Sequence, residues 1–307
     1  MKLLEELIKV QGTSGDEKEI RDFIISYVED NSSNWKSKPE LHYGEEFQDG
    51  LILSFGHPKT AIFAHTDTIG FTVGYSNNLI KVGGPRIIDG THLVGRDKHG
   101  DIETELMVVD HEDNSMEIKC VSERIFERGT TLSFKPNFRE TEEFIQSPYL
   151  DNRLGVWVAL KVAETLENGA IVFSTYEEHG GNSVGYLGKF LQQKYGTRQA
   201  LISDITWVTD GVKHGLGVAI SLRDKGIPRR QYINRIKEIA AGSGIKSQLE
   251  VESAGGSDGT MLQNSDLSYD WCFIGAPEDN VHTPDEKVHK DDIQSMIDLY
   301  EVLMREL

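Results

Sequence analysis

Residues 60–67 read TAIFAHTD, an apolar run from Thr60 to Ala64 followed at once by a histidine and an aspartate. Short apolar runs that end in turn or polar residues are typical of buried strands. Four more such runs occur, at 170–175, 200–202, 217–222 and 271–274. Between and around them, amphipathic patterns predict helices at 16–29, 152–166, 183–194, 229–241 and 290–305. Strands that alternate with helices predict an α/β fold whose sheet is covered by helices on both faces.

One long segment, residues 71–147, reads differently. It is rich in strand-forming residues and in Gly, Asp and Pro, as in FTVGYS at 71–76, LIKVGG at 79–84 and TTLSFK at 130–135. No convincing helical pattern interrupts it. We therefore expect a small all-β domain at 71–147, inserted into an α/β domain formed by residues 1–70 and 148–307.

Composition narrows the classes of function. The 307 residues carry a formal net charge of −18, which disfavours binding to nucleic acid. No apolar run approaches the roughly 18 residues of a membrane-spanning helix, and Glu5 and Glu6 interrupt the N-terminal apolar stretch, so we expect neither a membrane partner nor export. Only Cys120 and Cys272 occur, which excludes a disulfide framework and predicts a reducing cytoplasm. Any metal must be held mainly by histidines and carboxylates.

Polar clusters lie directly after predicted strands or at loop ends. Because ligands of open α/β sheets bind at the ends of strands, these side chains are the candidate site. Two divalent ions that share a bridging carboxylate require about two histidines, three acids and one further acid as a base. The candidates are His65, Asp67, Asp151, Glu177, Glu178, Asp204 and His282. Asp67, two residues from His65, is suited to accept the proton on the other ring nitrogen of that histidine.

Each of these signals also has a structural interpretation. A histidine after a strand is more often structural than a ligand, and a pair of glutamates in an acidic protein is usually solvated surface. Asp151 could serve only as the N-cap of the following helix. Five such clusters in one order would rarely arise by chance, which favours a metal site.

The residues of the clusters and their order along the chain resemble the M42 family of dinuclear metallo-aminopeptidases, which are related to the M28 and M20 peptidases. The matching motifs are GTSG at 12–15, AHTDTIG at 64–70, LDNRLG at 150–155, YEEHGG at 176–181, SDIT at 203–206, AGGSDGTM at 254–261 and VHTPDE at 281–286. The 86 residues from His65 to Asp151 leave room for an inserted domain, where the M42 pattern places its small β domain. The resemblance implies a mixed sheet with helices on both faces.

The resemblance also implies roles for individual residues. One metal ion would be held by His65, Asp151 and Asp204, and the other by Asp151, Glu178 and His282. Glu177 would be the general base, with Asp67 supporting His65. The two divalent ions would be zinc, with cobalt or manganese as alternatives.

The implied function is an aminopeptidase that hydrolyses N-terminal residues from peptides, working as a homo-oligomer. One alternative is an M20-like amidohydrolase, a carboxypeptidase or a deacylase of small acyl amino acids. An M20-like chain, however, places its second domain between the fourth and fifth ligands, which here are Asp204 and His282, only 78 residues apart. The other alternative is a degenerate member without catalysis, which the complete set of ligands disfavours.

Overall fold

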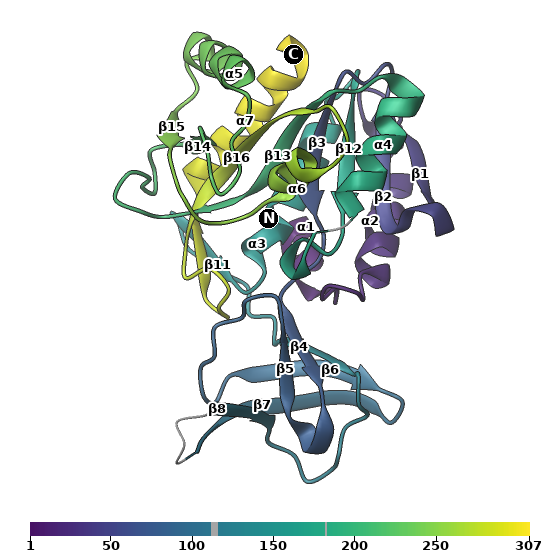
Figure 1. The fold of residues 1–307 in the computed structure, drawn as a ribbon, viewed down its shortest axis with the longest axis vertical. Helices are drawn as coiled ribbons and strands as arrows, with labels where there is room; N and C mark the ends of the chain where they lie inside the picture. Colours follow the sequence, from purple (N-terminus) through teal and green to yellow (C-terminus); the bar gives the residue numbers. More distant parts are fainter. Residues whose placement is uncertain (112–115, 182) are drawn as a thin grey trace.

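The computed structural model describes residues 1–111, 116–181 and 183–307, and these form two β-sheets with seven α-helices (Figure 1). The larger sheet has eleven strands, and helices surround it. The smaller sheet has six strands and lies at one end of the molecule, below the helices in the view of Figure 1.

Four parallel strands form the centre of the larger sheet. In spatial order they are β12 (Gly169–Ser174), β3 (Thr60–His65), β13 (Gln199–Trp207) and β16 (Asp270–Asp279). Antiparallel strands extend both sides, so the sheet is mixed. These outer strands are β1 (Glu40–Gly44), β2 (Gln48–Phe55), β17 (Glu286–His289), β11 (Phe144–Ser147), β10 (Arg139–Glu140) and β14 (Val218–Ser221), with β15 (Ser247–Glu250) parallel to β14.

Helices cover both faces of the larger sheet, as expected. Along β3, Ile62 and Ala64 pack on one side, whereas Ala61 and Phe63 pack on the other, because successive side chains of a strand alternate. The first side is covered by α1 (Lys2–Lys9), α2 (Lys18–Asn31), α3 (Leu150–Ala163), α5 (Arg230–Ser243) and α7 (Lys290–Glu306). The second side is covered by α4 (Ser183–Tyr195) and α6 (Asp258–Asn264). The predicted fold class is thus confirmed.

The smaller sheet is built entirely from the segment between His65 and Asp151. Its spatial order is β5 (Leu79–Val82), β4 (Gly70–Val73), β9 (Thr131–Phe134), β6 (His92–Asp97), β7 (Gly100–Asp110) and β8 (Met116–Cys120). The segment expected to form the insertion, 71–147, reaches too far. Residues 139–147 instead contribute β10 and β11 to the larger sheet, where β11 pairs with β17.

Two helices were not anticipated from the sequence. α1 buries Leu3, Leu4, Leu7 and Ile8. These residues have helical spacing, but the sequence argument used this stretch only to exclude an export signal. α6 has seven residues and follows a Gly- and Ser-rich loop, so its periodicity is too short to detect. Within the described part of the chain, no helix combines the length and apolar character needed to cross a membrane.

Candidate metal centre

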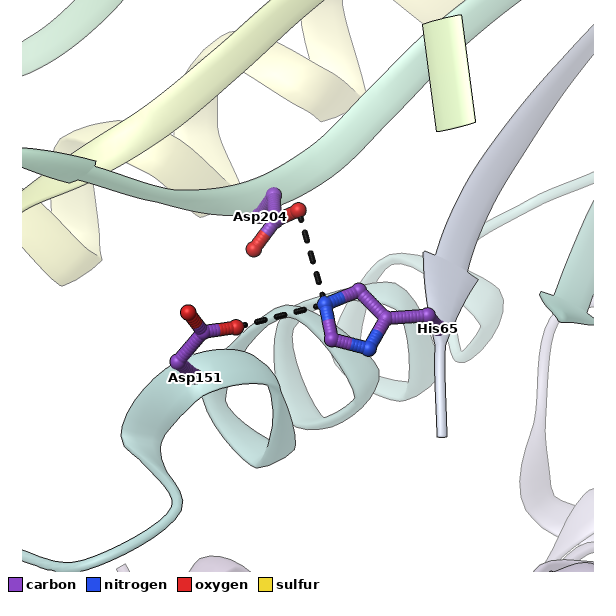
Figure 2. Close-up of side chains that lie close together, drawn as sticks. All are labelled: His65, Asp151 and Asp204. Carbon is purple, nitrogen blue, oxygen red and sulfur yellow. Dashed lines mark ion pairs between the residues drawn. The ribbon is translucent and has the colours of Figure 1, made fainter. Parts of the chain in front are cut away.

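The ends of the central strands bring the predicted site residues together. His65 is the last residue of β3, and Asp204 lies in the neighbouring strand β13. Phe63 pairs with Ile202, so His65 and Asp204, each two residues further on, lie at the same level of the sheet. Figure 2 shows both side chains converging with Asp151, which comes from the first turn of α3.

The structure forms two groups of three ligands that share Asp151. In the first group, His65 Nε2 lies 3.2 Å from Asp151 Oδ1 and 3.6 Å from Asp204 Oδ2 (Figure 2). In the second group, His282 Nε2 lies 3.4 Å from Asp151 Oδ2 and 3.3 Å from Glu178 Oε2. Within each group the candidate ligand atoms all lie within 4.8 Å of one another. The two oxygens of Asp151 therefore face one group each.

Asp151 does not act merely as a helix cap. Its φ and ψ are non-helical although it lies in the first turn of α3, and its carboxylate faces the two histidines. Arg153, two residues further along, is buried, and its guanidinium donates to the carbonyl oxygens of Thr66 and Val10. These bonds tie the start of α3 to the loop that follows His65.

Asp67 is buried and links His65 to the two glutamates. Its carboxylate accepts the backbone N–H groups of Glu177 and Glu178, each at 3.0 Å, and the hydroxyl of Ser14 at 2.6 Å. His65 Nδ1 lies 3.4 Å from Asp67 Oδ1 and closer, at 3.1 Å, to the carbonyl oxygen of the same residue. The nearest acceptor for the ring proton is thus the main chain of Asp67, whereas its carboxylate mainly holds the turn at 177–178.

Glu286 is a residue near the site that sequence reasoning missed. Its carboxylate is buried and accepts the backbone N–H of Asp151 at 3.2 Å and that of His282 at 2.9 Å. It therefore connects two ligands that are 131 positions apart in the chain. Its place in the motif VHTPDE was the available signal, but nothing local in the sequence shows that its partners are main-chain groups.

Burial and mutual charge shift the pKa values of the site residues. Burial would lower the pKa of His282, but Asp151 and Glu178 outweigh it and raise this pKa to about 11. Burial, with the neighbouring charge of Asp151, raises the pKa of Glu178 to about 7. Burial also raises the pKa of Glu177 well above its ordinary value, and the nearby His65 only partly opposes this.

These residues fit a pair of divalent cations. Three carboxylates lie around two histidines, and their negative charge raises the pKa of both imidazoles despite burial. Glu178 Oε1 is buried and has no hydrogen-bond partner among the described residues. Divalent ions would replace the imidazole protons and give this oxygen a partner. Imidazole and carboxylate ligands are those of zinc, manganese and cobalt sites.

The two ligand groups line a pocket of about 420 Å³, which Glu177 also lines. Away from the ligands, its wall includes Trp207, Met261 and Phe273 as apolar contacts. Asp224, Glu250, Glu252 and Arg86 are charged residues that also line this wall. The pocket is thus large enough to hold one amino-acid side chain beside the ligands.

Comparison with known proteins decides the family. The sequence model of the family described as M42 glutamyl aminopeptidase matches residues 76–299, which contain Asp151, Glu177, Glu178, Asp204 and His282. The chain belongs to the M42 peptidase family. As a member it is a metal-dependent aminopeptidase, an enzyme that hydrolyses peptide bonds. Among curated relatives, FrvX of Escherichia coli (strain K12), described as a candidate aminopeptidase, is 23% identical over 345 residues, which cover 97% of this chain and 93% of that protein.

Solved structures of M42-like enzymes share the fold. The TET aminopeptidase of a marine sediment archaeon of the Thaumarchaeota superposes with a TM-score of 0.87 at 18% identity, covering 100% of this chain and 97% of that one. The TET1 peptidase of Pyrococcus horikoshii gives a TM-score of 0.82 at 23% identity, with coverages of 100% and 99%. That peptidase is described as assembling into a tetrahedron or a large octahedral shell.

Proposed function

We propose that this M42 enzyme removes N-terminal residues from peptides with a dinuclear metal centre and with Glu177 as its general base. The observation that carries the proposal is the pair of ligand groups sharing Asp151 at a pocket that Glu177 also lines. Two divalent ions, with zinc as the expected metal, would supply Lewis-acid activation of water and of the scissile carbonyl.

The chain's own residues divide the remaining work. Glu178 directs Oε2 toward His282 and so belongs to the second ligand group. Glu177, its neighbour, takes the proton of the attacking water and delivers a proton to the leaving amine. Asp67 fixes the turn that carries both glutamates by accepting their two N–H groups. The pocket beyond the ligands receives the N-terminal side chain of the substrate.

Two further expectations concern the setting of the enzyme. We place it in the cytoplasm, because its two cysteines, Cys120 and Cys272, are free and buried rather than paired in a disulfide. We also propose a homo-oligomer. The smaller sheet and its loops expose the large apolar side chains of Tyr75, Ile80, Met116 and Ile125, and a second copy would cover such residues.

A substrate panel tests the reaction. Protein reconstituted with zinc, cobalt or manganese is assayed on aminoacyl p-nitroanilides, on their N-acetylated counterparts and on N-acyl amino acids. We expect hydrolysis only where a free α-amine precedes the scissile amide. Cleavage of N-acyl amino acids without cleavage of aminoacyl anilides would instead identify an M20-like deacylase.

A further inference from the structure

A loop of the smaller sheet reaches the second ligand group. Strand β5 ends at Val82, and the next residues, 83–86, run along His282 and Glu178. Gly84 O accepts from His282 Nδ1 at 3.1 Å, and the N–H of Arg86 donates to the carbonyl oxygen of His282 at 2.9 Å. Two hydrogen bonds from a distant part of the chain therefore hold this one ligand.

The first of these bonds decides which nitrogen can bind a metal. A carbonyl oxygen only accepts, so Nδ1 of His282 must carry the proton. The neutral ring then has its lone pair on Nε2, the atom that lies 3.3–3.4 Å from the carboxylates of Glu178 and Asp151. An outer hydrogen bond of this kind orients a ligand imidazole and raises its basicity.

The close approach of the loop requires glycine. A Cβ on Gly84 would lie 3.0 Å from Nδ1 of His282, so the imidazole or the loop would have to move. Gly83 has a φ of +69°, and a Cβ there would lie 3.1 Å from Glu178 O and 2.9 Å from Ile69 Cγ2. The loop thus packs its bare backbone against two of the three ligands in this group.

His282 itself depends on such support. Its φ is +64°, a left-handed conformation that is costly for a residue with a side chain. The N–H of His282 is held by Glu286 and its carbonyl oxygen by Arg86. Strand β17 of the larger sheet therefore holds the N–H of His282 through Glu286, and the loop after β5 of the smaller sheet holds its carbonyl oxygen through Arg86.

We infer that Gly84 is a positioning residue: through its contacts with His282, the loop at 83–86 sets the metal affinity of the Asp151, Glu178 and His282 group. The inference rests on the proposed dinuclear centre. It makes the smaller sheet part of the metal site.

Isothermal titration calorimetry, in which zinc is added to the metal-free protein, tests this inference. We expect Gly84→Ala to weaken one of two zinc sites by about 10–100-fold and to leave the other unchanged. Gly242→Ala is the matched control, because a Cβ there meets nothing within 4 Å, and it should keep both affinities. Circular dichroism verifies that each variant retains its sheets.

A double-mutant cycle separates positioning from general damage. If Gly84 acts through His282, the one zinc site that remains in His282→Ala should keep its affinity when Gly84→Ala is added. A weaker remaining site in the double variant, or unchanged zinc affinity in Gly84→Ala, would overturn the inference while leaving the dinuclear centre intact. A wild-type chain that binds no zinc would refute the proposed function instead.

The wild-type protein provides an independent check that needs no variant. In zinc-loaded protein labelled with ¹⁵N-histidine, NMR should show His282 protonated at Nδ1 and zinc-bound at Nε2. Zinc bound through Nδ1 would contradict the role given to the carbonyl of Gly84.

Discussion

At the scale of single residues, neighbouring glutamates have different surroundings. Glu178 Oε2 lies 3.3 Å from His282 Nε2, whereas Glu177 lines the pocket that both ligand groups share. The Asp67 carboxylate accepts both backbone N–H groups and so holds the main chain of the turn that carries both side chains. A metal ligand and a proton carrier can therefore stand next to each other in the sequence.

Substitution of each glutamate by glutamine separates the two roles. We expect Glu177→Gln to keep two bound ions and to lose about 10²-fold or more in kcat, because the amide cannot accept the proton. Glu178→Gln should instead lower the affinity for one ion. Metal analysis together with kcat on an aminoacyl anilide measures both effects, and the reverse result would exchange the two roles.

Part of the site could be predicted from residues alone. Histidines and acids that directly follow apolar runs mark strand ends, and His65, Asp151, Asp204, Glu178 and His282 do meet in space. The contacts of Glu286 and Gly84 could not be predicted, because both involve main-chain groups brought close by tertiary packing. Such contacts leave no periodic or compositional signal.

At the scale of elements, helix α3 positions Asp151 by lying very close to strand β13. A Cβ on Gly155 would overlap the carbonyl oxygen of Ser203 and the side chain of Asn152. Asn152 in turn donates to Ser203 O at 2.8 Å and accepts from the N–H of Gly155 at 3.0 Å. Glycine at 155 is thus required for the contact between helix and sheet.

We expect Gly155→Ala to destabilise the protein by about 1–3 kcal/mol, the usual range for a side chain forced into a packed interior. The matched change Gly242→Ala, on an exposed face of α5, should stabilise it by about 0.5–1 kcal/mol. Denaturant midpoints of the metal-free proteins measure both. Equal midpoints for Gly155→Ala and wild type would show that α3 can move away from β13 without cost.

The elements also show the limit of composition as a guide. The helix-free character of 71–147 correctly indicated strands, but it did not show which sheet they join. β11 pairs with β17, which lies 139 or more positions further along the chain, and such long-range pairing depends on the whole fold. Local patterns therefore identify strands better than they identify sheet membership.

At the scale of the whole molecule, the exposed apolar residues of the smaller sheet and its loops point to self-association. We expect a molar mass in light scattering after size exclusion that is a multiple of 34.4 kDa. The mass should persist as salt is raised, because salt screens the repulsion between acidic surfaces and does not weaken apolar contacts. A mass near 34 kDa at micromolar concentration and every salt level would show a monomer.

The number of divalent ions bound per chain is the most direct test of the dinuclear centre. Equilibrium dialysis against zinc with elemental analysis is performed on wild type and on His65→Ala, His282→Ala and Asp151→Asn. We expect two ions in wild type and one in each histidine variant. Asp151→Asn should weaken both sites, because its two oxygens face one group each. Full peptidase activity in a wild-type chain without any transition metal, or two tightly bound ions in Asp151→Asn, would contradict a centre bridged by Asp151.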